Sequence, residues 1–417
     1  MAFPRWNMLS YWSYFTGGVI MLASFLLPGG AAQSGWTSYA PLAVIAPGQT
    51  MWLVGMVFLI TSSLLGAFNF LTTIVNMRAP GLTYGRLPIF VWAQFVTSVL
   101  LLLAFPPLEA ASIFQLMDRL AGTSFFLPAG LVVDGVPLVA SGGGQALLWQ
   151  HLFWFLGHPE VYVLVLPAMG IVAEILAANT RKPLFGYKEI VWSLGFIGVM
   201  SFLVWAHHMF LSGMKPALAN FFLVTTLIIS VPSVTILTSF IWTLRGASIR
   251  FTVPMLFALA FLPLFGIGGL TGLPLGVTVT DIYLHDTQYV IGHFHYVVVT
   301  GSLIALMGGF YHWAPKMFGK MLNPFWGRVH FWGTAISMNG IFFPMFIQGM
   351  AGVQRRLYDP TVQVHNLSTQ PLNGVMFFFS MALMLFQVPF LLNLAWTLWR
   401  GKRIEEENPW HATTLEW

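Results

Sequence analysis

The chain of 417 residues contains no cysteine, and only 7% of its residues are charged. The absence of cysteine excludes disulfides and thiolate metal sites, so other side chains must hold any metal. The low charge excludes an ordinary soluble domain, in which about a quarter of the residues are charged. Because 57% of the residues are hydrophobic, the composition predicts an all-α membrane protein with several spanning helices.

Hydropathy divides the chain into ten predicted spans. They cover residues 9–28, 51–76, 87–106, 148–178, 187–212, 219–244, 252–272, 287–313, 328–350 and 372–399. The longest stretch between them, 107–147, carries few charges, and no internal repeat is present. We therefore expect one helical bundle, with residues 1–417 forming a single domain.

The basic residues support this count. Fourteen of the eighteen lysines and arginines lie at the N-terminus, at the C-terminus or in every second loop. The other side holds only Arg119, Lys215, Arg355 and Arg356. The positive-inside rule then places both termini in the cytoplasm or its equivalent. Topology also accounts for the net charge of +5, so no nucleic-acid partner is expected.

Two predicted spans carry ionisable groups, which are costly in hydrocarbon and by default functional. The fourth span contains His158, Glu160 and Tyr162, and the fifth contains His207 and His208. His158 and Tyr162 are four residues apart and share one helix face. Three imidazoles from neighbouring helices can meet at one metal ion, and imidazole suits copper, iron and zinc.

A plainer explanation is open for each of these residues. A lone histidine in a membrane helix is more often a packing residue or a hydrogen-bond partner than a ligand. Glu160 is two residues from His158 and points to a different face. There it either carries a proton or only hydrogen-bonds a neighbouring helix.

The eighth span contains His293 and His295. These two residues are two positions apart, which corresponds to a rotation of about 200° around a helix, so their imidazoles point to nearly opposite sides. One helix could therefore offer an axial ligand to a planar cofactor on each flank, and imidazole is a common axial ligand of haem iron. Two unrelated polar contacts are the alternative.

A third polar group is predicted on the outer side. His285 and Asp286 lie just before the eighth span, and Arg355 and Arg356 share one outer loop. The first pair could bind a hard divalent cation. The arginines could hold carboxylates, such as haem propionates. Ordinary solvation of loops is the alternative.

Three motifs in this order carry a family resemblance: GHPEVY at 157–162, AHHMF at 206–210 and HFHY at 293–296. The chain resembles subunit I of the haem-copper terminal oxidases, in the branch with a membrane glutamate. The similarity extends over essentially the whole chain, to the terminal TLEW. It implies a twelve-helix fold and four-electron reduction of oxygen to water coupled to proton pumping.

The resemblance also implies roles for the residues of the two histidine groups. His158, His207 and His208 would ligate one copper ion, and Tyr162 would be cross-linked to His158. Glu160 would be the carboxyl at which the proton path branches. His293 would bind the iron of an a-type, high-spin haem. His295 would bind the iron of a low-spin haem.

Further roles follow from the same resemblance. Asn7, Ser62, Ser63 and Asn69 would line a proton channel. His285 and Asp286 would bind magnesium or manganese. Arg355 and Arg356 would meet the haem propionates, and Trp36 and Trp154 would contact cofactors.

The expected partners are subunits II and III, oxygen, and cytochrome c or quinol as the electron donor. The expected location is a bacterial plasma membrane or the inner mitochondrial membrane.

The chain departs from the family pattern at two places. It starts in the loop after the family's second span, so the second axial ligand of the low-spin haem is expected to be absent and that haem held poorly. A misassigned start or a separate polypeptide would explain this. Ile236 stands where a proton-channel lysine is usual, and Ser233, Thr235 and Thr238 offer hydroxyls instead.

Two other functions compete with oxygen reduction. Nitric oxide reduction belongs to the same superfamily, but Glu160 and Tyr162 argue against it. A non-catalytic haem-binding remnant is the other alternative, and metal analysis that finds haem iron without copper would favour it.

The predicted topology can be tested by labelling, because the chain has no cysteine of its own. We expect Gly246→Cys, in a predicted inner loop, to react with a membrane-impermeant maleimide only after the cells are opened. Ser368→Cys, in a predicted outer loop, should react in intact cells. The reverse labelling pattern would contradict the assigned orientation.

Overall fold

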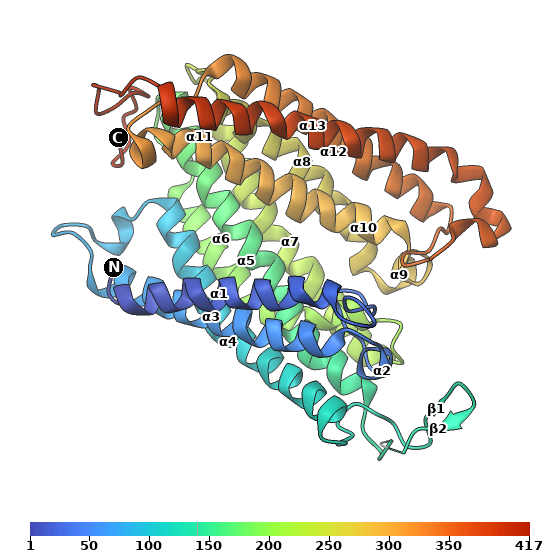
Figure 1. Cartoon of the computed structure of the whole chain (residues 1–417). Helices are drawn as coiled ribbons and strands as arrows, with labels where there is room; N and C mark the ends of the chain where they lie inside the picture. The colour runs from blue at the N-terminus through green and yellow to red at the C-terminus, as the bar shows by residue number, and fades with distance from the viewer. Residues whose placement is uncertain (140) are drawn as a thin grey trace. The chain divides into compact units, whose positions relative to one another are not determined.

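The computed structural model describes residues 1–139 and 141–417 (Figure 1). These residues form helices joined by loops, with one small hairpin of β1 (Val132–Val133) and β2 (Val136–Pro137). Asp134 and Gly135 form its turn with φ of 51° and 79°, as the common two-residue hairpin turn requires. The prediction of an all-α membrane bundle is confirmed, with the hairpin confined to a loop.

Contacts between residues divide the chain into two units. The first contains Met1–Arg86, Gln94–Val163 and Gly198–Met214, and the second contains Leu87–Ala93, Leu164–Ile197 and Lys215–Trp417. The single domain expected for residues 1–417 stays a prediction.

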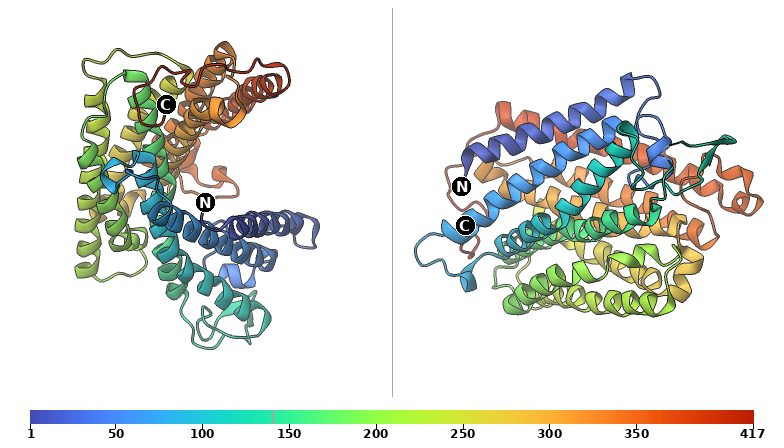
Figure 2. Two further views of the ribbon diagram at one scale, coloured as in Figure 1. Left: turned by 90° about the vertical axis from the view of Figure 1, so that its left-hand side faces the viewer. Right: turned by 90° about the horizontal axis from the view of Figure 1, so that it is seen from below.

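In the first unit, α1 (Pro4–Ala23) packs along α3 (Gln49–Asn76), as Figure 2 shows. Two glycines allow this close approach: a Cβ on Gly17 would lie 2.8 Å from the carbonyl oxygen of Gly55. Small residues serve the same purpose where membrane helices pack. The other elements that contribute to this unit are η1 (Ser24–Leu26), α2 (Leu42–Ile45), η2 (Tyr84–Arg86), α4 (Ile89–Leu120), α5 (Ala146–Thr180), η3 (Ser201–Leu203) and η4 (Trp205–Met209).

In the second unit, α12 (Pro324–Met350) packs against α13 (Pro371–Arg400), and α8 (Val253–Gly276) packs against α11 (Ile304–Phe318). Asn323 caps α12 by accepting from the backbone nitrogens of its first turn, and a proline follows it, as is typical of helix starts. The other elements here are α6 (Tyr187–Met200), α7 (Pro216–Leu244), α9 (Thr278–Leu284), α10 (Gln288–Phe294), η5 (His295–Leu303), η6 (Pro360–Val362) and η7 (Val364–Thr369).

The predicted spans correspond to the observed helices. Within residues 1–139 and 141–417, nine helices are long and apolar enough to cross a membrane. The remaining predicted span, 328–350, lies within α12. This helix is less apolar because it buries polar side chains, among them His330, Thr334 and Gln348.

Three details differ from the predicted spans. Helix α4 continues through Pro106 and Pro107 to Leu120, well past the predicted end at 106. The fifth span changes after Met200 from α-helix to 3₁₀-helix in η3 and η4. The eighth span is interrupted by the π-helix η5. Hydropathy detects an apolar run but not its hydrogen-bond register, so it could not predict these changes.

The last residues of the chain dock onto α11. The indole of Trp410 donates to the carbonyl oxygen of His312 at 2.9 Å, and the indole of Trp417 lies 3.1 Å from its Nε2. Glu416 accepts from Trp313 and pairs with Lys316 at 3.1 Å. The TLEW motif is therefore part of the packed structure of the second unit.

Gly349 on α12 tests the close packing of α10 against that helix. A Cβ at Gly349 would lie 2.0 Å from the backbone nitrogen of Tyr289, so Gly349→Ala must push the two helices apart. Overpacking of this kind costs about 1–3 kcal/mol. We expect a lower midpoint of thermal unfolding. Gly374→Ala on α13, where no atom lies within 4 Å of the added Cβ, is the control, and equal midpoints would contradict the packing.

Candidate metal centre

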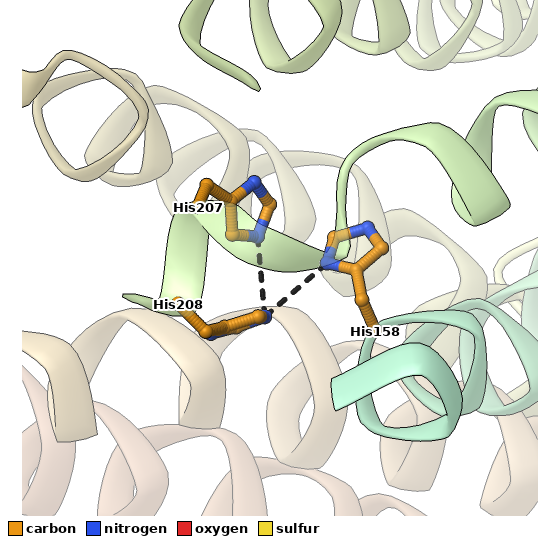
Figure 3. Close-up of side chains that lie close together, drawn as sticks. All are labelled: His158, His207 and His208. Atoms are coloured by element: carbon orange, nitrogen blue, oxygen red, sulfur yellow. Dashed lines mark hydrogen bonds between the residues drawn. The ribbon is translucent and has the colours of Figure 1, made fainter. Parts of the chain in front are cut away.

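Three imidazoles converge in the first unit (Figure 3). Nδ1 of His158, on α5, lies 3.3 Å from Nε2 of His208, on η4. Nε2 of His207 lies 3.1 Å from the same atom. One nitrogen from each ring lies within 4.8 Å of the others, and His158 is buried. The predicted convergence of these three side chains is present in the structure.

The spacing suits one metal ion. Metal–nitrogen bonds of about 2.0 Å at a tetrahedral angle hold two ligand nitrogens about 3.3 Å apart. The two measured distances, 3.3 and 3.1 Å, agree with that value. The donor set consists of neutral imidazoles without thiolate, which suits copper. Because ligands must be deprotonated, a bound metal would replace the protons of these contacts.

The local backbone explains how neighbouring residues His207 and His208 face the same point. In η4, the nitrogen of His207 donates to the carbonyl oxygen of Val204 at 3.1 Å, three residues back. This tighter turn is typical of a 3₁₀-helix. It brings the two ring centroids to 4.4 Å, at 64° to one another.

Aromatic side chains surround the three histidines. The ring of Tyr162 lies 4.8 Å from that of His158, as expected for residues one turn apart. Trp154 stacks on His208 at 3.8 Å, with the two planes 10° apart. Trp36 packs edge-on against Trp154 at 5.8 Å. Trp154 thus lies against a histidine and Trp36 lies behind Trp154, while the predicted contact of both tryptophans with a cofactor stays a prediction.

Sequence reasoning missed Tyr39. Its hydroxyl accepts from the indole nitrogen of Trp154 and so fixes the ring that stacks on His208. Tyr39 lies 115 residues from Trp154 in the chain, and no motif links the two. Glu160 is half-buried on α5, and its role in proton transfer stays a prediction.

The predicted axial ligands His293 and His295 belong to the second unit and contact different helices. Nδ1 of His293 lies 3.0 Å from the carbonyl oxygen of Gly268 on α8. The ring of His295 stacks on that of Phe342 of α12 at 4.4 Å. Its Nδ1 lies 2.8 Å from the carbonyl oxygen of Ile291. The two imidazoles thus face different neighbours, as the 200° spacing predicts.

These two carbonyl contacts fit iron ligation. A carbonyl oxygen only accepts, so each Nδ1 must carry the proton, and the lone pair is then on Nε2. Histidines that bind metals are usually oriented in this way. The residues present therefore fit axial ligation by His293 and His295.

The outer polar group lies at the junction of α9 and α10. Nε2 of His285 is 3.9 Å from Oδ2 of Asp286, whereas adjacent ligands of an octahedral magnesium ion are about 3 Å apart. The two side chains would need a small shift to share a cation. Asp286 also pairs with Arg355, whose Nε is 3.5 Å from its Oδ1. The predicted cation site and the propionate contacts of Arg355 and Arg356 stay predictions.

Asp281 is a further residue that the sequence analysis missed. Its Oδ2 is 3.1 Å from Nδ1 of His285, four residues later, a spacing that could have suggested the contact. Burial disfavours protonation of His285, but the hydrogen bond and the charge of Asp281 outweigh it and raise the pKa of His285. Burial raises the pKa of Asp281 as well.

The four predicted channel residues lie on α1 and α3. Asn69 donates to Asn7 at 3.4 Å. The hydroxyl of Ser62 donates to the carbonyl oxygen of Ser10 at 2.6 Å, while Ser63 bonds back to Leu59 of its own helix. Asn7, Asn69 and Ser62 thus join the two helices, and Ser10 is an additional hydroxyl in the same row.

Residues 1–382 match the family model described as cytochrome c and quinol oxidase polypeptide I. The chain belongs to this family. The predicted resemblance to oxidase subunit I is thereby confirmed, and the protein is of the type of a respiratory terminal oxidase catalytic subunit. Family membership implies haem and copper as cofactors, other oxidase subunits as partners and a location in a membrane.

Curated relatives agree over the full length of the chain. An alternative cytochrome c oxidase subunit 1 of Bradyrhizobium diazoefficiens is 44% identical, covering 100% of this chain and 71% of the relative. Cytochrome c oxidase subunit 1 of Synechocystis sp. is 42% identical, covering 100% and 72%. A cryo-EM structure of a heme-copper terminal oxidase dimer has the same fold, with a TM-score of 0.75 at 21% identity over 96% of this chain and 70% of that one.

Metal analysis tests the convergent histidines. We expect His208→Ala to remove nearly all copper, because two imidazoles alone leave a weak site, while haem iron is retained. His411→Ala, whose side chain is 61% exposed, is the control and should keep its copper. Copper bound in full by the His208 variant would exclude the site.

Proposed function

We propose that this chain reduces oxygen to water at a copper ion and a high-spin haem and couples the reaction to proton translocation. The observation that carries the proposal is the convergence of nitrogens from His158, His207 and His208 at distances that suit one metal. Copper and haem would together supply the electrons and the oxygen-binding centre. Side chains of this protein hold these groups and move the protons.

His158, His207 and His208 hold the copper, and His293 holds the iron of the high-spin haem. His295 would bind the iron of a second, low-spin haem, which would supply electron relay. Support comes from the two backbone carbonyls, of Gly268 and Ile291, that direct the Nε2 lone pairs of His293 and His295. An a-type haem is our proposal for the high-spin site.

Tyr162 supplies a hydrogen atom, that is, one proton and one electron, when the oxygen bond is cleaved. Its ring lies one helical turn from the ligand His158, at 4.8 Å, which is close enough for the proposed covalent link between the two side chains. Trp154 holds the His208 ring flat against its own. Trp36 and Trp154 then form part of the wall around the cofactors.

Protons enter along α1 and α3 and reach Glu160. Asn7, Asn69, Ser62 and Ser63 orient water along this route, supported by the hydrogen bonds that Asn69 and Ser62 make across the two helices. Water is needed because amide and hydroxyl groups position protons but do not hold them at neutral pH. Glu160 is the carboxyl from which protons are distributed.

The outer group binds a divalent cation and contacts the haem. His285 and Asp286 bind magnesium or manganese, with Asp281 orienting His285 through a hydrogen bond of 3.1 Å. Arg355 and Arg356 bind the haem propionates.

Other subunits complete the complex. Electrons come either from cytochrome c through subunit II or from quinol, and subunit III is a further partner. Both termini lie in the cytoplasm of a bacterial cell or its equivalent.

Tyr162→Phe tests the chemistry without removing a ligand. The ring and its packing stay, so copper and haem should remain bound, while loss of the hydroxyl lowers oxygen consumption at least about a hundredfold. Oxygen uptake with a reduced donor measures this. Tyr283→Phe, at a side chain that is 78% exposed, is the control, and normal turnover of the Tyr162 variant would refute its assigned role.

A further inference from the structure

Two glycines of α8, Gly268 and Gly272, lie four positions apart in the sequence GGLTG and therefore share one face of the helix. This face contacts the segment that carries His293. A Cβ on Gly268 would lie 3.0 Å from the backbone nitrogen of Val297, on η5, and a Cβ on Gly272 would lie 2.7 Å from Cε1 of His293, on α10. Both contacts follow one antiparallel register, because His293 precedes Val297 by four residues. All four residues belong to the second unit.

The two glycines differ in what they accommodate. An added Cβ on Gly268 meets the backbone of η5, so this glycine allows two helices to approach each other, as small residues do in membrane proteins. At Gly272, the three nearest atoms all belong to the imidazole of His293: Cε1 at 2.7 Å and Nδ1 and Nε2 at 3.4 Å. Ordinary contacts between carbon atoms are about 3.5–4.0 Å long. The missing side chain of Gly272 therefore makes room for the His293 ring rather than for a neighbouring helix.

The same turn of α8 also holds the Nδ1 edge of the ring. Nδ1 of His293 lies 3.0 Å from the carbonyl oxygen of Gly268 and 3.4 Å from the hydroxyl oxygen of Thr271. The Thr271 hydroxyl donates within its own helix, to the carbonyl oxygen of Ile267 at 2.8 Å or to that of Gly268 at 3.0 Å. A hydroxyl has one hydrogen to donate and two lone pairs, so the oxygen of Thr271 remains able to accept from Nδ1.

We propose that Thr271 and Gly272 are positioning residues for the iron ligand His293. Gly272 sets where the imidazole ring lies, and Thr271 provides a second acceptor for its Nδ1–H. This assignment rests on the proposed function, in which His293 binds the iron of the high-spin haem. Partners of this kind orient a ligating imidazole and raise its basicity, so both residues act on the strength of the iron–nitrogen bond without touching the iron.

Substitution of Gly272 separates this role from helix packing. The atom that an added methyl group meets is at the far end of a side chain, so the ring moves aside and the helices keep their distance. Gly268→Ala lacks this property, because the methyl group meets the backbone of Val297. We therefore expect Gly272→Ala to keep its midpoint of thermal unfolding and its copper, and to change only the bond that the displaced ring makes with iron.

Resonance Raman spectroscopy of the purified, reduced complex measures this bond through the iron–histidine stretching band of the high-spin haem. Gly272→Ala should shift the band to lower frequency, because the displaced imidazole binds the iron less directly. Gly269→Ala is the matched control on the same turn, where no atom lies within 4 Å of the added Cβ, and should keep the wild-type frequency. A band at the wild-type frequency in Gly272→Ala would overturn the role of this glycine.

The hydroxyl of Thr271 is tested by two variants of similar size. Thr271→Val removes the acceptor and should lower the frequency of the same band, because the ring becomes a weaker base. Thr271→Ser keeps the hydroxyl and should restore the wild-type frequency. A purely structural role would instead lower the midpoint of unfolding of Thr271→Val and leave the band in place, and that result would overturn the assignment of Thr271.

His293→Ala distinguishes failure of this proposal from failure of the proposed function. We expect the iron–histidine band in the wild-type complex and its loss in His293→Ala. A band that persists in His293→Ala, or that is absent from the wild-type complex, would overturn iron ligation by His293 and the positioning role with it. A band that depends on His293 but is the same in Gly272→Ala and Thr271→Val would overturn the positioning role alone.

Discussion

A polar group in hydrocarbon must find its partner inside the protein, and the functional side chains of this chain depend on that constraint. His293 and His295 each satisfy Nδ1 with a backbone carbonyl oxygen, which leaves the lone pair of the other ring nitrogen for the proposed iron. The constraint that stabilises the fold thus also sets the protonation of the proposed metal ligands. In the first unit the partners are side chains instead, because ring nitrogens of His158 and His207 both contact Nε2 of His208.

Each unit holds a distinct set of candidate metal-binding side chains. The first unit contains the three convergent histidines, with Tyr162 and Trp154 against them. The second contains His293, His295 and the outer group around His285, which the loop after α12 covers through the pair of Asp286 and Arg355. The proposed copper ligands therefore all belong to the first unit, and the proposed axial ligands all belong to the second.

The sequence predicted the spans, the convergence of His158, His207 and His208, and the family, because membrane spans and ionisable residues within them are rare, strong signals. It did not predict Tyr39, because its partner Trp154 lies 115 residues away and no motif links the two. It also did not predict Asp281, although the spacing of four residues from His285 could have suggested that contact. The continuation of α4 to Leu120 was also missed, because prolines suggest a break in a helix that packing can override. The hairpin at Asp134 and Gly135 was overlooked although its turn sequence is characteristic.

The π-helix η5 begins at His295 and ends at Leu303, directly before α11. A π-turn holds one residue more than an α-turn, so the same residues wound as a regular α-helix would rotate everything that follows about the helix axis. His312 would then turn away from Trp410 and Trp417, which now dock on it. The irregular turn thus sets the rotation of α11 relative to α10 about their common axis. It lets this segment direct the proposed ligand His295 to one neighbour and the docking site at His312 to another. A regular helix of the same length could not combine these two directions.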